Sequence, residues 1–146
     1  MWRNGWFHSG DVFVRDADGD YALVGRVKDS IRRRGENISA AEVERELLAH
    51  SAIADAAVIG IQVAVEQEVM AFLVPRAGEQ PAPDDVIAFV TERLPYYAVP
   101  RFVEFVDELP RTLALRADKQ ELRERGITAA TWDREAAGIR LRRERL

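Results

Sequence analysis

The sequence predicts a small α+β fold, in which an N-terminal β-hairpin precedes a small three-stranded sheet packed by about three helices. Two β-rich runs on either side of an Asp-Gly pair predict the hairpin. Three later apolar runs, at 53–59, 68–74 and 101–106, predict the strands of the sheet. Capping signals around these runs mark where helices begin or end.

The hairpin is expected to pair residues 11–16 with residues 21–26. Asp18-Gly19 lies between the two runs, and glycine supplies the positive φ that a tight turn needs. A lone two-stranded hairpin is only marginally stable in water, so its aromatic side chains need a surface on which to pack. These aromatic residues are Trp6, Phe7, Phe13 and Tyr21.

A basic cluster follows the hairpin and leads into the lone Gly35. Its members are Arg26, Lys28, Arg32, Arg33 and Arg34. The cluster alternates in part with Val27 and Ile31, which suits a short strand with one buried face. Two interpretations are open: a solvated charged surface, or a cationic strand and turn that meets an anion, with Gly35 allowing a close backbone approach.

The first helix is predicted to start at Ser39. Ser39 and Glu42 have the spacing of a capping box, and Ile38 with Val43 fits a hydrophobic staple. The helix is expected to run to about His50, which suits the end of a helix better than a metal site, because no further ligand stands nearby. Its expected buried residues are Val43, Leu47 and Leu48.

Two further helices follow. Pro83 with Asp84 and Asp85 opens the second, because proline suits the first turn and carboxylates suit the positive end of the helix dipole. Its buried positions are expected at Val86, Ile87, Val90 and Leu94. The third is a polar helix over 117–125 that Gly126 ends.

Residues 62–67 are expected to form a loop between the first two strands of the sheet. Residues 127–146 carry a possible helix around Trp132 and then an arginine-rich end. Those arginines suit either an anion or a membrane surface, or simply a frayed terminus, which is the ordinary behaviour of chain ends.

Composition excludes several classes of function. The chain has 146 residues, 47% of them hydrophobic and 32% charged, with a net charge of −4 and no cysteine. The absence of cysteine excludes disulfides, thiolate metal sites and a cysteine nucleophile. No basic excess points to nucleic acid, and no apolar run approaches the roughly 20 residues of a membrane span. With no signal peptide visible, a cytoplasmic protein without a metal site of its own is expected.

Four ordered motifs carry a resemblance to a known family. They are Gly5-Trp-Phe-His-Ser-Gly-Asp11, Gly25-Arg-Val-Lys-Asp-Ser-Ile-Arg-Arg-Arg-Gly-Glu-Asn-Ile38, Val99-Pro-Arg-Phe-Val-Glu-Phe-Val106 and Leu109-Pro-Arg-Thr112. In this order they resemble the C-terminal part of the adenylate-forming superfamily, which includes acyl-CoA synthetases, peptide-synthetase adenylation domains and luciferases. The wording of residues 34–44, Arg-Gly-Glu-Asn-Ile-Ser-Ala-Ala-Glu-Val-Glu, looks closest to the carnitine/crotonobetaine-type carboxylate–CoA ligases. The resemblance covers residues 2 to about 126.

The resemblance implies roles for three residues around the first hairpin. Asp11 matches the aspartate that accepts hydrogen bonds from the ribose hydroxyls of ATP. Arg26 matches the arginine beside the ribose and phosphates, and Lys28 stands at the hinge about which the domain rotates. The structural alternatives are a turn residue, a surface arginine and a surface lysine.

The resemblance also implies two loops that act in different steps. Gly35, Glu36 and Asn37 match the loop that lines the pantetheine tunnel during thioester formation. Arg116 stands where the family has its adenylation lysine, which bridges the substrate carboxylate and the α-phosphate. Arginine keeps the charge but is larger and forked, and the surrounding turn lacks the family's proline and glycine. Lys119 would replace it only if the loop shifted by three residues.

The expected organisation has three parts. Residues 1–27 belong structurally to the end of a large N-terminal domain, residues 28–126 form the mobile lid domain with its hinge near 28, and residues 127–146 form a tail. The first hypothesis is the lid of an ATP-dependent carboxylate–CoA ligase, with ATP or AMP, CoA and a small carboxylate as ligands. Magnesium would come through the large domain. The second hypothesis is a non-catalytic remnant or binding module that docks a protein or a CoA-like ligand.

Overall fold

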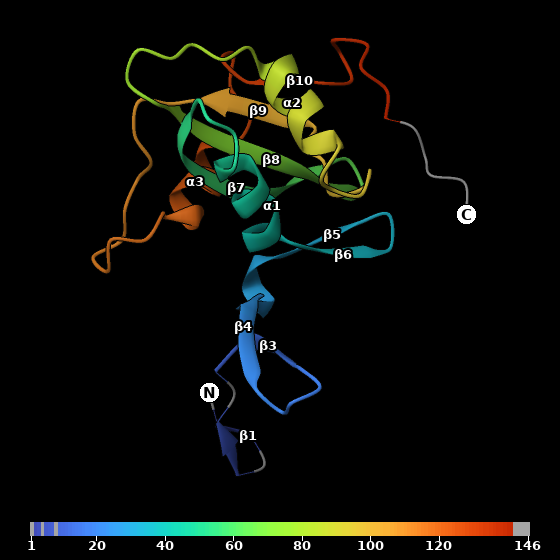
Figure 1. Ribbon diagram of the computed structural model, residues 1–146, viewed down its shortest axis with the longest axis vertical. Coiled ribbons are helices and arrows are strands. Elements are labelled where there is room, and N and C mark those ends of the chain that lie inside the picture. The colour runs from blue at the N-terminus through green and yellow to red at the C-terminus, as the bar shows by residue number, and fades with distance from the viewer. Residues whose placement is uncertain (1, 4, 8, 142–146) are drawn as a thin grey trace.

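The computed structural model describes residues 2–3, 5–7 and 9–141, which form a sheet with helices on both faces and N-terminal hairpins that extend from it (Figure 1). The sheet has the order β10-β9-β8-β7. Its strands are β7 (Ile53–Val63), β8 (Glu66–Pro75), β9 (Phe102–Phe105) and β10 (Trp132–Asp133). The helices are α1 (Ala40–Leu48), α2 (Pro83–Thr91) and α3 (Lys119–Arg125). The predicted α+β class is confirmed, with a fourth, two-residue strand added to the sheet.

The strands of the sheet pair in both directions. β7 and β8 are antiparallel, β8 and β9 are parallel with α2 in the connection between them, and β9 and β10 are antiparallel. The predicted loop at 62–67 is wrong, because β7 continues to Val63 and β8 already begins at Glu66. Ala64 adopts a left-handed φ of 53°, so a two-residue turn is enough to reverse the chain.

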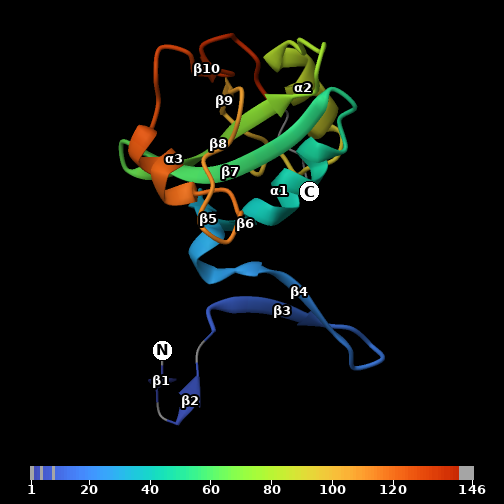
Figure 2. The same ribbon diagram turned by 90° about the vertical axis from the view of Figure 1, so that its left-hand side faces the viewer.

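Two apolar clusters lie on opposite faces of the sheet. Helices α1 and α2 cover one face and α3 covers the other, as Figure 2 shows. Along β8 the buried side chains alternate between the clusters, with Val69 in the first and Met70 in the second. Because both faces of β8 are covered, the strand is a continuous apolar run, which agrees with the pattern of its sequence.

The predicted start of α1 is confirmed. The Ser39 side-chain oxygen accepts a hydrogen bond from the backbone N–H of Glu42, at 3.4 Å. Val43 and Leu47 are buried, but Leu48 is exposed, so that part of the prediction is wrong. Leu48 directly follows Leu47 on the helix, so it points about 100° away from the buried stripe.

The ends of α2 and α3 also follow the sequence. Pro83 stands at the first turn of α2, and Val86, Ile87 and Val90 are buried beneath it. Asp118 caps α3 by accepting from the N–H groups of Gln120 and Glu121. Gly126 follows α3 with a positive φ of 63°.

The chain before α1 consists of short hairpins. Their strands are β1 (Trp2–Arg3), β2 (Trp6–Phe7), β3 (Asp11–Arg15), β4 (Tyr21–Arg26), β5 (Ser30–Arg33) and β6 (Glu36–Ser39). β3 pairs with β4 as predicted, and Figure 1 shows this hairpin extending away from the sheet. Trp6 and Tyr21 remain 75% and 68% exposed, and Phe13 is exposed as well, so these aromatic side chains have no packing surface within the described chain.

Residues 127–141 are part of the folded body. The predicted helix around Trp132 is wrong, because Trp132 and Asp133 form β10 and pair with Val103 and Phe102 of β9. The next residue, Arg134, is buried, and its Nε donates to the Pro100 carbonyl at 3.2 Å. The expectation of a frayed terminus therefore fails for 127–141, while the arginines of 142–146 lie outside the described residues.

A buried carboxylate fixes the start of this segment to β9. Glu104 is fully buried and accepts hydrogen bonds from Thr131 Oγ1 at 2.6 Å, Thr128 Oγ1 at 2.8 Å and Arg125 Nη2 at 2.5 Å. Burial by itself raises the pKa of Glu104, but these hydrogen bonds outweigh it, so the pKa lies below its ordinary value of 4.5. Glu104 therefore stabilises the fold above the pKa of the unfolded chain, and this stabilisation is lost as the pH falls through the lowered folded-state pKa.

We expect the Glu104→Gln variant to lose less stability than the wild type as the pH falls from 7 to 3. Since hydrogen bonds to a charged group contribute about 1.5–3 kcal/mol, the difference in unfolding free energy between the two proteins should narrow by about that amount. Urea denaturation at a series of pH values measures it. Glu108→Gln, on the exposed loop nearby, is the control; an equal change in both variants would contradict the assignment to Glu104.

Candidate functional site

The first hairpin brings two of the predicted residues to its inner end. In the β3–β4 register Asp11 is the direct partner of Arg26. The Asp11 N–H donates to Ser9 Oγ at 3.2 Å, and the Val27 N–H donates to the Gly10 carbonyl at 2.8 Å. The backbones of the two predicted nucleotide-binding residues are therefore paired, although the side chain of Arg26 lies outside the described part of the structure.

The predicted hinge is a single 3₁₀ turn, η1 (Val27–Asp29), between β4 and β5. The Lys28 side chain lies outside the described part of the structure, but its backbone is at the middle of this turn. Asp29 is bound to α3 of the body, because its carboxylate lies 3.7 Å from Arg123 Nη2 and 4.0 Å from Lys119 Nζ. A turn this short joins the hairpin to the body through very few backbone dihedrals.

The second candidate group lies at the tip of the β5–β6 hairpin. Arg33 pairs with Glu36, so Arg34 and Gly35 alone make the turn, with φ values of 51° and 84°. Two positive φ values are typical of a type I′ turn, which suits glycine and strains arginine. A side chain at Gly35 would meet open space, so only the backbone conformation requires glycine within the described structure.

The hairpin tip lines a groove of about 380 Å³. Glu36 and Asn37 are exposed, as residues that meet a ligand must be. The backbone N–H of Arg32 donates to the Gln67 side-chain oxygen at 3.0 Å, which ties the hairpin to β8. The groove residues are Arg32, Arg34, Gly35, Gln62, Val65, Glu66 and Gln67.

Arg116 lies on a different loop. Residues 112–116 form a tight turn in which the Thr112 N–H donates to the Arg116 carbonyl at 2.8 Å. Arg116 is exposed, as are Leu113 and Leu115, and Leu115 holds a left-handed φ of 58°. A leucine in this conformation is strained, because its Cβ crowds the following carbonyl. The loop thus exposes the Arg116 guanidinium next to apolar side chains, and its backbone holds Leu115 in a strained conformation.

The Arg116 loop forms the lip of a cleft of about 560 Å³. Arg111 anchors the loop through an ion pair with Asp55 of β7. Lys119, the other basic residue considered for adenylation, is mostly buried and lies 2.8 Å from Glu44 Oε1. Glu44 also accepts from the Val58 N–H at 2.8 Å, so Lys119 is fixed within the body while Arg116 is not.

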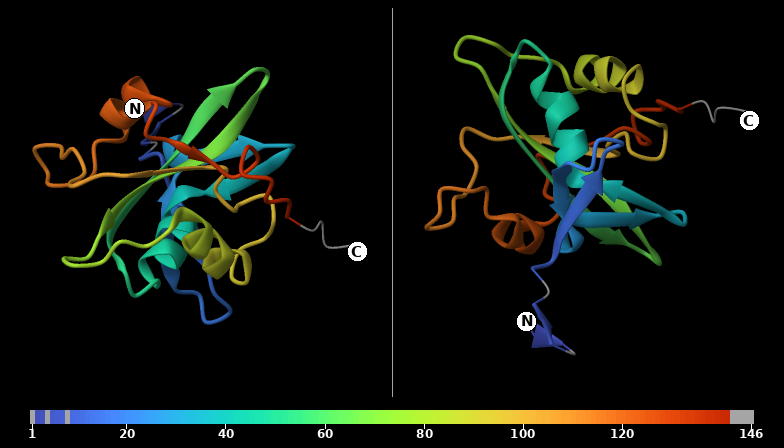
Figure 3. Two further views of the ribbon diagram at one scale, coloured as in Figure 1. Left: turned by 90° about the horizontal axis from the view of Figure 1, so that it is seen from above. Right: turned by 60° about the horizontal axis from the view of Figure 1, so that its bottom comes forward.

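The candidate residues therefore lie at three places. The Arg116 loop and the β5–β6 tip extend from opposite sides of the body in Figure 1, and the view from above in Figure 3 agrees. Asp11 and Arg26 lie beyond the hinge on the extended hairpin. The sequence predicts candidate residues at all three places, and the structure does not bring them together into one site.

A network of buried charges behind the β5–β6 hairpin was missed. Arg33 Nε lies 2.7 Å from Glu68 Oε2, and both side chains are almost fully buried. Arg101, the residue just before β9, lies 3.7 Å from Glu68 and 3.1 Å from Asp133, so the network continues from the hairpin through β8 to β10. The hydrogen bond to Asp133 raises the pKa of Arg101. The only local signal was the charge of Glu68 at the start of an apolar strand.

The described residues hold neither a metal-binding cluster nor a membrane-spanning helix. No group of three or more histidine, cysteine or acidic residues there is arranged to hold a metal ion. No helix in the same part of the chain combines the length and apolar character needed to cross a membrane.

Comparison with known proteins gives concordant results. The family profile described as "AMP-binding enzyme C-terminal domain" matches residues 42–114. Feruloyl-CoA synthase of an Amycolatopsis species is 44% identical over 124 residues, which are 84% of this chain and 25% of that protein. Acetyl-coenzyme A synthetase of Methanothrix soehngenii is 38% identical over 129 residues, 86% of this chain and 19% of that protein. The chain thus spans about a quarter or less of the length of these relatives.

Solved structures agree with the sequence matches. ATP-bound MatB from Rhodopseudomonas palustris superposes with a TM-score of 0.79 at 32% identity, covering 85% of this chain and 25% of that one. The o-succinylbenzoate CoA synthetase of Bacillus subtilis, in complex with its acyl-adenylate intermediate, gives 0.76 at 32% identity, covering 83% and 25%.

Proposed function

This chain belongs to the AMP-binding enzyme C-terminal domain family, and on that premise we propose that it is the mobile lid of an ATP-dependent carboxylate–CoA ligase. A large adenylation domain would supply the ATP and acyl sites. The proposal fits the share of each relative that the chain covers, about a quarter of feruloyl-CoA synthase for example. It also accounts for the exposed aromatic residues of the first hairpin, which a larger domain would cover.

One observation carries the proposal: a single 3₁₀ turn connects the Asp11–Arg26 hairpin to a body with candidate loops on opposite sides. Rotation about Val27–Asp29 would let one body present first the Arg116 loop and then the β5–β6 tip to the same ligand. The β7–β8 hairpin, the helices and their two apolar clusters would move as a unit.

The proposed chemistry has two steps. A carboxylate attacks the α-phosphate of ATP, forming an acyl-adenylate and releasing pyrophosphate. The CoA thiol then attacks the acyl carbon, forming the thioester and releasing AMP. Arg116 would stabilise charge on the phosphate in the first step, and the Arg34-Gly35 turn would border the path of the thiol arm in the second.

Magnesium would accompany ATP through the large domain. The described residues offer no cluster of acidic or histidine side chains suited to hold it. In the proposal, Asp11 would bind and orient the nucleotide, and the ligands of the magnesium ion would come from the large domain.

The acid is the least constrained part of the proposal. Residues 34–44 resemble the carnitine/crotonobetaine-type ligases, but the acyl pocket would lie in the large domain, so carnitine-like acids, medium-chain fatty acids and aryl acids are all candidates to assay. The chain's relatives include a feruloyl-CoA synthase and an acetyl-coenzyme A synthetase, so similar C-terminal domains belong to enzymes named for different acids. Selection of the acid would consequently belong to the large domain.

A chimera tests the proposal. The large part of the Amycolatopsis feruloyl-CoA synthase is joined to this chain in place of its own C-terminal quarter, and the two half-reactions are measured separately. We expect thioester formation from supplied feruloyl-adenylate well above that of the large part alone. A folded chimera that binds ATP but forms no thioester would contradict the lid assignment and favour the non-catalytic docking module.

A further inference from the structure

The β5–β6 hairpin is anchored to the body at two residues directly before its turn. The Arg32 N–H donates to the Gln67 side-chain oxygen at 3.0 Å. The next residue, Arg33, has its Nε 2.7 Å from Glu68 Oε2. Both contacts thus join the end of β5 to consecutive residues near the start of β8, and the Arg34-Gly35 turn follows at once.

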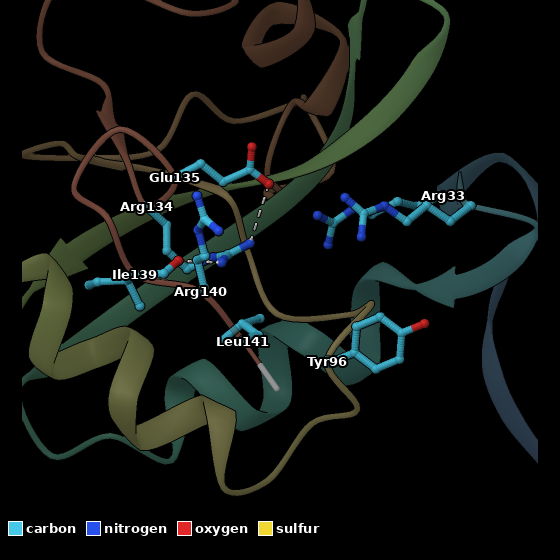
Figure 4. A pocket seen from close by; sticks show the side chains of 8 residues that line it. Arg33, Tyr96, Arg134, Glu135, Ile139, Arg140 and Leu141 are labelled. Carbon is cyan, nitrogen blue, oxygen red and sulfur yellow. Dashed lines mark hydrogen bonds and ion pairs between the residues drawn. The ribbon is translucent and has the colours of Figure 1, made fainter. Parts of the chain in front are cut away.

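Arg33 is the deeper of the two anchors. It is 2% exposed, and its Nη1 also donates to the Tyr97 carbonyl at 3.0 Å, so one side chain joins the hairpin both to β8 and to the chain after α2. It reaches from the hairpin toward the segment that holds Arg134 and Glu135, beside a cleft of about 560 Å³ (Figure 4). Ile31, two residues earlier on the same face of β5, is buried as well.

Glu68 is fixed between two arginines. Its Oε2 faces Arg33, and its Oε1 lies 3.7 Å from Arg101 Nη1. Arg101 is in turn held by Asp133 at 3.1 Å. Because the two oxygens of the buried carboxylate face different cations, the carboxylate has one favoured orientation, and Arg33 must meet it there.

This ion pair is better suited to placing the hairpin than to stabilising the fold. Burial lowers the pKa of Arg33, and the charge of Glu68 acts against that effect. Within the described structure Arg33 Nε and Glu68 Oε2 have no hydrogen bond, so their mutual attraction is what offsets their burial. A buried pair of this kind is often no more stable than well-packed apolar side chains. An apolar side chain can pack in several ways, however, whereas the pair forms in one arrangement only.

The turn depends on such support from the body. Arg34 holds a left-handed φ of 51°, a strained conformation that persists only where the surrounding structure determines it. β5 and β6 have four residues each and form a sheet of their own, and a lone two-stranded hairpin is marginally stable. The anchors at the end of β5 are therefore needed to hold the turn in one position.

We propose that Arg33 and Glu68 are positioning residues for thioester formation, because their ion pair sets the position of the Arg34-Gly35 turn relative to the sheet. The role of the turn in this step rests on the proposed function. Both side chains are buried and act through the turn, without contact to CoA. Loss of the pair should therefore impair the second half-reaction while sparing the first half-reaction and the stability of the fold.

Hydrogen exchange of the full chain tests the placement of the hairpin without any assay of activity. In Arg33→Met/Glu68→Leu, which leaves no buried charge unpaired, the amides of residues 30–39 should exchange about tenfold faster, while those of residues 53–63 keep their protection. Glu68→Gln removes the charge but keeps the shape, and it allows the same comparison if the double variant does not fold. Unchanged exchange at 30–39, or an equal rise at 30–39 and 53–63, overturns the proposal.

A matched control variant carries the same two substitutions elsewhere. Arg45→Met/Glu46→Leu removes an ion pair of α1 whose arginine is exposed, and it should leave the exchange of residues 30–39 unchanged. Faster exchange at 30–39 in this control as well would show that the effect does not come from the Arg33–Glu68 pair.

The feruloyl chimera tests the consequence for the reaction. With supplied feruloyl-adenylate, Arg33→Met/Glu68→Leu should lower the rate of thioester formation by about 10²-fold, since a misplacement of about 1 Å has costs of that size. ATP–pyrophosphate exchange should stay at the level of the parent chimera, a split that a general loss of folding would not produce. The α1 control should leave both half-reactions unchanged.

The outcomes separate this inference from the proposed function. A folded parent chimera that forms no thioester contradicts the proposed function, while the hydrogen-exchange result still decides whether the ion pair places the turn. An active parent chimera whose double variant keeps both its thioester rate and its protection at 30–39 removes only the positioning role of Arg33 and Glu68.

Discussion

Replacing Arg116 by lysine is expected to raise adenylation by the feruloyl chimera by about 10²-fold. Removal of a single preorganised charge-stabilising donor lowers the rate by about 10²–10³-fold. A guanidinium fork in place of a lysine ammonium at the charge-stabilising position should lower the adenylation rate by a similar factor. Arg116 is exposed on a turn whose neighbour Leu115 is strained, so the loop can present a compact ammonium without repacking any core residue. ATP–pyrophosphate exchange measures the adenylation step alone.

Two comparisons make this result specific. Arg76→Lys is the same substitution at an exposed position outside the loop and should leave exchange unchanged. Thioester formation from supplied adenylate should be the same in the Arg116→Lys chimera as in its parent, because the proposed mechanism assigns that step to the other side of the body. A chimera that forms thioester but shows no gain in exchange with lysine would show that Arg116 does not occupy the charge-stabilising position.

Glu68→Ala is expected to destabilise the isolated chain by about 3–5 kcal/mol. The substitution leaves the Arg33 guanidinium buried without the carboxylate that lies 2.7 Å away, and removing one partner of a buried ion pair has costs of that size. Arg101 would lose one neighbour but keep Asp133 at 3.1 Å and Glu135 at 3.3 Å. Urea denaturation at pH 7 gives the change in unfolding free energy.

The double variant Arg33→Met/Glu68→Leu is the informative comparison. It removes both charges and fills their space with apolar groups, so it should recover most of the lost stability. Glu79→Ala, at an exposed position, controls for the loss of a glutamate and should have little effect. A double variant as unstable as Glu68→Ala would show that the buried charge of Arg33 is not the source of the cost.

The elements with local signals were predictable. Ser39 capping α1, Pro83 opening α2 and the Asp18-Gly19 turn are short-range features, so a few neighbouring residues determine them. The position of Gly35 in a turn followed in the same way, because few other residues adopt its φ of 84°. The pairing of 11–16 with 21–26 was predicted as a hairpin, but its register, which sets Asp11 opposite Arg26 and includes a bulge between Val12 and Phe13, was not.

The elements without local signals were missed. Arg33 and Glu68 are 35 residues apart, and nothing near either residue shows that they pair. β10 has two residues, too few for an alternating pattern, and it forms because Trp132 and Asp133 complete the edge of β9. Arg134 carried no signal in the sequence, although its Nε donates to the Pro100 carbonyl in the interior. Such contacts depend on the tertiary fold.

The short strand β10 also affects whether the chain tends to aggregate. β9 is hydrogen-bonded to β8 on one side, and Trp132 with Asp133 occupies the other. A chain shortened to residue 126 would uncover the backbone N–H and C=O groups of β9, next to the apolar Phe102 and Val103. An open, apolar strand edge is a template for pairing with a second molecule. By covering the free edge of β9, Trp132 and Asp133 are therefore expected to prevent this self-association, although they form a strand of only two residues.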